Sequence, residues 1–156
     1  MATCQICGRE IKAGNGRIAH HGYKRPGGGW QTSSCRGARY RPYEVACDRI
    51  QPEIDGIKEW MARTEESLAK MLADPPQVLM EGQEGPSFRS RWVSYQKPEG
   101  FTAASSPSYM PRTYNSLYFR MLGEWKDGLK SAGQEVDRLE KRLAAWIAPM
   151  PQEIST

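Results

Sequence analysis

The sequence has few cysteines and histidines, and it places all of them near its start. The 156 residues include four cysteines and two histidines, and none of these lies beyond Cys47. No apolar run approaches the roughly 20 residues that span a bilayer, and no apolar signal-peptide core precedes Cys4. We therefore expect a soluble, cytoplasmic protein without a membrane anchor. In that reducing compartment cysteines are more plausible as metal ligands than as disulfide partners.

Sequence motifs of the common enzyme classes are also absent. The chain contains no Gly-rich phosphate loop and no Gly-x-Ser-x-Gly nucleophile turn. A metal-dependent hydrolase needs an open coordination position, whereas a set of cysteines and histidines can fill all four positions of a structural site. We therefore predict that the protein is not an enzyme and has no catalytic residues.

The motif Cys4-Gln-Ile-Cys7-Gly8 is the strongest chemical signal that is present. Two thiolates at this spacing can reach one small cation, and the glycine relieves the backbone where the turn folds back under the metal. The motif predicts a zinc knuckle that binds a structural Zn²⁺. Cys35 is the best third ligand, because zinc ribbons and treble clefs place a ligand at the end of the following hairpin.

Residues 17–35 read as that hairpin, with a Pro-Gly-Gly-Gly turn at 26–29. Adjacent strand residues point to opposite faces, so only one of His20 and His21 can share the zinc. Pairing Tyr23 with Trp30 would turn His20 toward Cys35, and a one-residue slip would turn His21 there instead. We prefer His21 because the glycine after it eases a local twist. The alternatives for the fourth ligand are Cys47 and His20.

Two apolar stripes with alternating spacings of four and three residues predict two helices. The first helix is expected at about 52–73, where Pro52 suits the first turn and Asp74-Pro75-Pro76 ends the run. The second is expected at about 115–148. At 1.5 Å per residue it would be roughly 50 Å long, more than a compact domain of this size requires. Part of it could therefore pair with a second copy of the chain and form a homodimer.

These elements predict a mainly α member of the α+β class with two domains. Residues 1–49 would form a treble-clef-like zinc finger with a β-hairpin. Residues 50–156 would form a long antiparallel helical hairpin that carries a β-containing insertion at 75–114. Strands are expected at 77–81 and 88–96 of the insertion, and in the second strand Trp92 and Tyr95 would lie on opposite faces.

The positive charge is concentrated in the expected finger. Residues 1–49 contain nine lysines and arginines against three acidic residues, a formal charge of +6, while the rest of the chain carries −2. Basic and aromatic side chains together suit nucleic acid, and they also make protein-interface hot spots. The chain could thus bind nucleic acid or a host protein complex. The candidate contact residues are Lys24, Arg25, Arg36, Arg39, Arg41, Arg89, Arg91, Trp92 and Tyr95.

A family resemblance is carried by short strings within the first 49 residues. They are His20-His21-Gly22-Tyr23, Arg25-Pro26-Gly27, Gly29-Trp30-Gln31-Thr32, Ser34-Cys35 and Pro42-Tyr43-Glu44. Over this third of the chain the sequence resembles small zinc-finger-like proteins of bacterial phages and other mobile elements. The resemblance implies a phage or mobile-element context in a bacterial host, and it implies no particular reaction.

Overall fold

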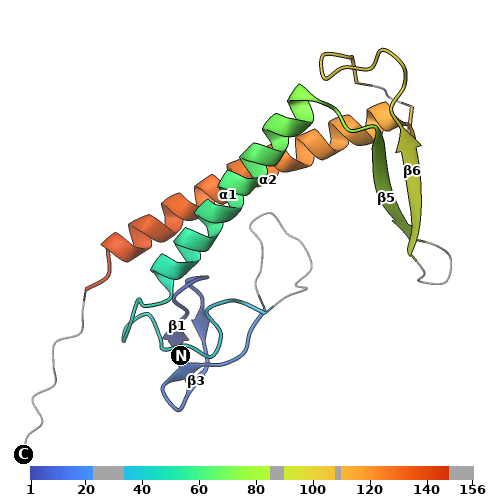
Figure 1. Ribbon diagram of the computed structural model, residues 1–156. Helices are drawn as coiled ribbons and strands as arrows, with labels where there is room; N and C mark the ends of the chain where they lie inside the picture. The colour runs from blue at the N-terminus through green and yellow to red at the C-terminus, as the bar shows by residue number, and fades with distance from the viewer. Residues whose placement is uncertain (23–33, 85–89, 108–109, 148–156) are drawn as a thin grey trace, which may run out of the picture. The chain divides into compact units, whose positions relative to one another are not determined.

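The computed structural model describes residues 1–22, 34–84, 90–107 and 110–147. They form two helices and three small antiparallel sheets, which confirms the α+β class (Figure 1). The chain divides into two compact units, one of Met1–Lys58 with Gln134–Thr156 and one of Glu59–Gly133. Within the residues that are described, neither helix combines the length and the apolar character that crossing a membrane would take.

The first unit begins with two short hairpins. Strand β1 (Ala2–Thr3) pairs with β2 (Glu10–Ile11), so that the Cys-x-x-Cys motif lies in the loop between them. Strand β3 (Ala13–Gly14) then pairs with β4 (Arg17–Ile18). The turn of this second hairpin is Asn-Gly, and both of its residues adopt positive φ angles, 52° and 71°. Such a turn matches the twist of the flanking strands.

The hairpin predicted over 17–35 is present only in part. Its first residues, Arg17 and Ile18, pair instead with the preceding strand β3. This hairpin was not predicted, although Asn-Gly is a strong turn signal. An antiparallel bridge between Gly22 and Ser34 links the two arms of the expected hairpin. The predicted pairing of Tyr23 with Trp30 lies outside the described residues.

Helix α1 spans Ile50–Ala73 and begins slightly earlier than predicted. The amide of Arg49 donates to Gln5 Oε1 at 2.9 Å, and that of Ile50 donates to the Cys47 carbonyl at 3.0 Å. These bonds satisfy amides at the helix start, which have no partner inside a helix. The predicted apolar stripe is the covered face of α1, since its members are all buried or half-buried: Ile50, Ile54, Ile57, Met61, Thr64, Leu68 and Met71.

Helix α2 spans Tyr114–Ala144. Thr113 and Ser116 cap its start, because each backbone amide donates to the other residue's hydroxyl oxygen, at 3.1 and 3.2 Å. The helix ends before the predicted 148. There the Trp146 indole donates to the Tyr43 carbonyl at 2.7 Å, which holds the chain after the last turn.

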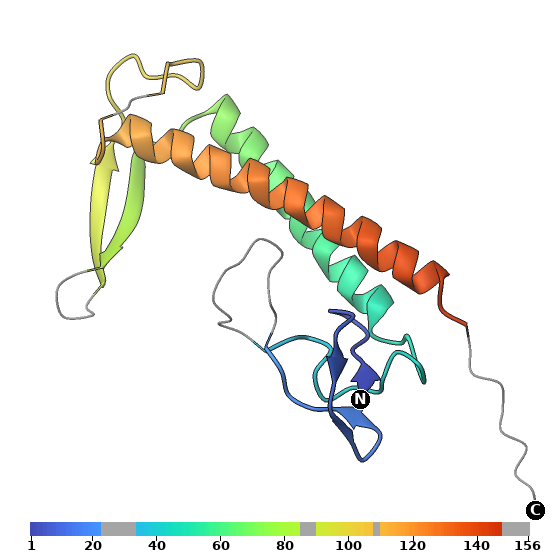
Figure 2. The same cartoon turned by 180° about the vertical axis from the view of Figure 1, so that it is seen from behind.

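The second unit contains the β-hairpin of the insertion and an aromatic core. Strand β5 (Val78–Glu84) pairs with β6 (Ser90–Gln96), the longest ladder in the structure (Figure 2). Leu79 packs with Met71 of α1 and with apolar residues of α2. The Tyr118 hydroxyl is fully buried and donates to the Met71 carbonyl at 2.8 Å. This unit therefore has a core that contains no cysteine. Its other buried members are Tyr114, Leu117 and Leu122.

Candidate metal centre

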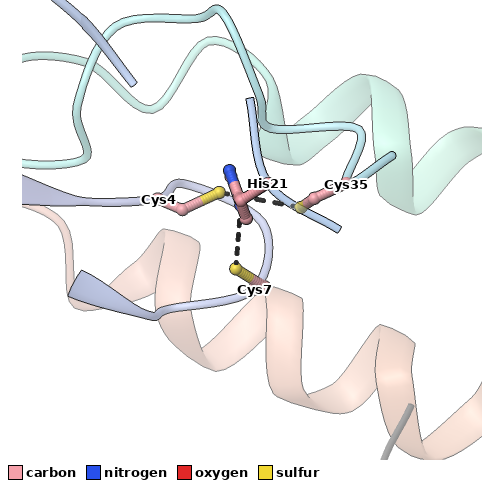
Figure 3. Close-up of side chains that lie close together, drawn as sticks. All are labelled: Cys4, Cys7, His21 and Cys35. Carbon is pink, nitrogen blue, oxygen red and sulfur yellow. Dashed lines mark hydrogen bonds between the residues drawn. The ribbon is translucent and has the colours of Figure 1, made fainter. Parts of the chain in front are cut away.

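Four side chains in the first unit could hold one metal ion. The ligand atoms of Cys4, Cys7, His21 and Cys35 all lie within 4.8 Å of one another (Figure 3). The Sγ atoms of Cys4 and Cys35 are 3.8 Å apart, and Cys7 Sγ lies 3.4 Å from His21 Nε2. Cys4 and Cys35 are almost completely buried, so solvent has little access to their sulfurs.

The loop between β1 and β2 positions the first two cysteines. The Cys4 amide donates to the Arg9 carbonyl at 2.9 Å, and the Gly8 amide donates to the Cys4 carbonyl at 3.1 Å. Gly8 has a φ of 72°, in the left-handed region that glycine adopts without strain. These features close the tight turn that the sequence predicts and direct both sulfurs to one side of it.

The register of the second strand pair brings His21 to the sulfurs. The bridge between Gly22 and Ser34 places His21 opposite Cys35, and the Cys35 amide donates to the His21 carbonyl at 2.8 Å. His21 Nδ1 lies 2.9 Å from the Ala19 carbonyl oxygen, which can only accept. Nδ1 therefore carries the ring proton, and Nε2 directs its lone pair toward the sulfurs.

The other two candidates for the fourth ligand lie outside this group. His20 is exposed, and its Nε2 is 2.8 Å from the Ser34 hydroxyl oxygen. Cys47 is half-buried just before α1 and is not among the clustered ligands. The structure thus brings together the four residues that the sequence analysis preferred.

A glycine that the sequence analysis did not single out makes room for the cluster. Cys35 and Ala38 close a turn in which the Ala38 amide donates to the Cys35 carbonyl at 2.9 Å. Within this turn a Cβ on Gly37 would overlap Cys4 Sγ and would lie 3.2 Å from the side chain of Ile6. Only a residue without a side chain lets this turn approach the sulfur so closely.

The buried side chain of Gln5 joins the loop between β1 and β2, here called the metal loop, to the start of α1. Its Nε2 donates to the Arg41 carbonyl at 2.9 Å and to Asp48 Oδ1 at 3.0 Å, while its Oε1 accepts from the Arg49 amide. The side-chain amide of Gln5 is thus satisfied at both ends although the residue is completely buried. A polar residue between two cysteines gave no signal of this role in the sequence.

Two arginines of α2 bind the outer side of the loop. Arg142 donates to the carbonyls of Gln5 and Cys4, at 2.9 and 3.2 Å, and its guanidinium lies 3.9 Å from the centre of the Tyr43 ring. Arg138 donates to the Ile6 carbonyl at 2.6 Å. Three successive carbonyls of the loop are therefore all paired with guanidinium groups.

Hydrogen bonds with cysteine sulfurs are the largest cause of the pKa shifts in the cluster. The hydrogen bond with Cys35 lowers the pKa of Cys4 to about 4, and the same hydrogen bond, with burial, raises the pKa of Cys35. The two neighbouring sulfurs therefore titrate as a pair. Hydrogen bonding to Cys7 raises the pKa of Arg9, whose Nε lies 3.5 Å from that sulfur.

The predicted contact residues fall into three groups. Arg36 and Arg41 form ion pairs with Glu53 and Asp48, at 3.0 and 3.3 Å. Arg39 and Trp92 are exposed, and the half-buried Tyr95 donates its hydroxyl to Glu81 at 3.2 Å. Lys24, Arg25 and Arg89 lie outside the described residues. Of Arg91 only the backbone, in β6, is described.

Comparison of the chain with models of protein families, with curated proteins and with solved structures finds no match.

Proposed function

We propose that this is a zinc-stabilised, non-catalytic binding protein of a phage or other mobile element, which binds nucleic acid through the basic surface of residues 1–49. The observation that carries the proposal is the donor set of the metal centre. Three sulfurs and one imidazole nitrogen fill a tetrahedral site and leave no position for a substrate. The ion would then organise a small fold, and function would lie on the surface of that fold.

Zinc is the metal that this donor set favours. At a Zn–S distance of about 2.3 Å, tetrahedral geometry separates two sulfurs by about 3.8 Å. The Sγ atoms of Cys4 and Cys35 are 3.8 Å apart. Thiolate and imidazole ligands favour zinc over the hard cations magnesium and calcium. With the knuckle and the hairpin before α1, the donor set supports a treble-clef-like finger. The two helices would form an antiparallel hairpin.

The charge of the finger supports an anionic partner. Two of its three acidic residues are engaged inside the module, since Glu44 binds the Thr3 amide at 2.9 Å and Asp48 binds Gln5 and Arg41. With all three acidic residues counted, residues 1–49 still carry a formal charge of +6. An excess of exposed arginine and lysine is the electrostatic signature of nucleic-acid binding.

Metal analysis and fluorescence anisotropy on the full-length protein test the proposal together. We expect one zinc per chain, and binding to labelled single-stranded or duplex oligonucleotides that weakens steadily as salt is raised. Protein stripped of zinc by a chelator should lose most of this affinity, because the basic surface would no longer be organised. Absence of binding at low salt, with zinc fully loaded, would contradict the nucleic-acid proposal.

A second candidate function, docking on a host protein complex, is favoured by one face of the β5–β6 hairpin. Val78, Met80 and Trp92 are 42%, 57% and 66% exposed, and the register places all three on the same face. Exposed apolar residues grouped in this way often mark protein interfaces. A pull-down from bacterial lysate treated with nuclease distinguishes the two functions. Partners that survive nuclease but no longer bind the Trp92→Ser variant would favour protein docking.

A further inference from the structure

The finger contains a hollow that is separate from the metal centre. It is shallow and widely open to solvent, has a volume of about 450 Å³, and is lined by residues of the β3–β4 hairpin and by Arg39. We infer that this hollow is a phosphate-binding subsite in which Arg17 and Arg39 hold a backbone phosphate of the nucleic acid. The inference rests on the proposed function and assigns it a specific place. The lining residues are Gly14, Asn15, Arg17, Ile18, Ala19, His20 and Arg39.

Backbone hydrogen bonds hold the two arginines beside the same strand. The Arg39 amide donates to the Ile18 carbonyl at 2.8 Å, and the Ile18 amide donates to the Tyr40 carbonyl at 2.8 Å. Ile18 itself is 1% exposed and anchors this strand in the core. Arg17 and Arg39 therefore extend from a fixed backbone, while their side chains remain exposed.

Among the described residues, no carboxylate forms an ion pair with the arginines of the hollow. Within residues 1–22, 34–84, 90–107 and 110–147, neither Arg17 nor Arg39 has an acidic partner within ion-pair distance. Arg36 and Arg41, which precede and follow Arg39, both pair with carboxylates. Two cations that line one hollow without a counter-charge favour an anionic ligand.

The backbone of Arg39 gives a second and independent argument. Its φ is 68°, in the left-handed region that glycine or asparagine would adopt more easily than arginine. Backbone strain of this kind is often found at functional sites. The guanidinium of Arg39 suits a phosphate ligand, because it can donate two parallel hydrogen bonds to phosphate oxygens.

The other wall of the hollow lets a phosphate approach the main chain. Cβ atoms added at Gly14 or Gly16 would meet nothing within 4 Å, so the turn presents open space beside the arginines. A sugar-phosphate backbone could therefore lie along the turn with its bases directed away. Contacts of this kind fix the position of nucleic acid without reading its sequence.

Salt titrations of oligonucleotide affinity test the subsite with Arg17→Gln, Arg39→Gln and Arg39→Gly. The glycine variant removes the charge and relieves the backbone, so weaker binding could not be attributed to misfolding. Each variant should bind several-fold more weakly, and removal of one phosphate contact should reduce the slope of log K against log salt by about 0.7 for single strands. Arg63→Gln, which removes an exposed arginine of α1 paired with Glu59, is the matched control. Zinc content confirms that each variant is folded.

A second arm uses inorganic pyrophosphate and amide chemical shifts of the labelled wild-type protein. Shifts centred on residues 14–18 and 39, together with the reduced slopes, would support the subsite. Wild-type slopes in all three arginine variants would overturn the inference and leave nucleic-acid binding in place. If the wild type binds no oligonucleotide, the proposed function falls. Amide chemical-shift changes on addition of pyrophosphate would then show that the hollow binds a different phosphate compound. Their absence would overturn the subsite as well.

Discussion

Gly37 lies directly against Cys4, so closely that a single methyl group on the glycine would overlap the cysteine's Sγ atom. This relationship joins two turns of the chain that lie far apart in sequence. It makes the geometry of the metal centre depend on a residue that binds no metal.

Gly37→Ala should therefore weaken metal binding. The added Cβ must displace either Cys4 Sγ or the turn that carries Cys35, and overpacking of this kind costs about 1 to 3 kcal/mol. We expect a metal affinity at least about 10-fold lower, the range in which supporting groups disturb a metal site, measured by competition with a chromogenic chelator. Gly56→Ala is the control, because nothing lies within 4 Å of a Cβ there. Equal affinities of the two variants would contradict the steric argument.

Replacing the ligand candidates one at a time should separate them. His21→Ala should lose most of its bound metal, because the imidazole Nε2 completes the group of four. Cys47→Ser and His20→Ala should keep one metal per chain, since neither side chain belongs to that group. Elemental analysis after gel filtration provides the measurement. Loss of metal from the Cys47 variant alone would mean that the assigned fourth ligand is wrong.

Gln5→Met should destabilise the first unit although the side chains are similar in size. The change removes the groups that bind the Arg41 carbonyl and the Arg49 amide, and buried polar groups left without a partner cost about 1 to 3 kcal/mol. The free energy of unfolding from urea denaturation gives the cost. Gln51→Met, at an exposed position of α1, should change stability by no more than about 0.5 kcal/mol. Similar values for both variants would show that the bonds of Gln5 contribute little.

Arg142→Lys should loosen the loop that carries Cys4 and Cys7. Lysine keeps the charge but cannot bind the Cys4 and Gln5 carbonyls together while stacking on Tyr43. Removing one charged hydrogen bond costs about 1.5 to 3 kcal/mol, so the melting temperature should fall by several degrees. Arg63→Lys makes the same exchange at an exposed position and should melt like the wild type. If both variants melt together, Arg142 does not stabilise the loop.

Removal of the metal should affect the two units differently. The core around Cys4, Ile6 and Ile18 includes the cluster itself, whereas the core around Tyr118 contains no cysteine. Hydrogen exchange measured by mass spectrometry, with and without a strong chelator, should show reduced protection over residues 2–22 and retained protection near Tyr118. A simultaneous decrease in both regions would show that the metal stabilises the whole chain.

The helices and the pair Cys4 and Cys7 could be predicted because their signals are local. A stripe with spacings of four and three residues produces one covered face, and the stripe from Ile50 to Met71 is covered in the structure. Cys4 and Cys7 are close in sequence, so their spacing alone brings two sulfurs together. The predicted homodimer through the second helix depends on a second chain and stays a prediction.

The remaining parts of the candidate site depend on contacts between distant segments. The choice of His21 over His20 follows from the register of the Gly22–Ser34 bridge, which turn residues alone did not fix. Gly37, Gln5 and Arg142 act through neighbours that lie far away in the sequence, and none of the three is a metal ligand. The Asn15-Gly16 hairpin, in contrast, carried a readable signal that the sequence analysis did not use.

The hydrogen bonds from Arg142 can form only after most of the chain has been synthesised. Cys4 and Arg142 are separated by 138 positions, so a ribosome completes the metal loop long before it adds the arginine that binds the loop's outer carbonyls. During synthesis those carbonyls must be hydrated. The support that α2 gives to the loop of Cys4 and Cys7 would form only after the arginine has been added.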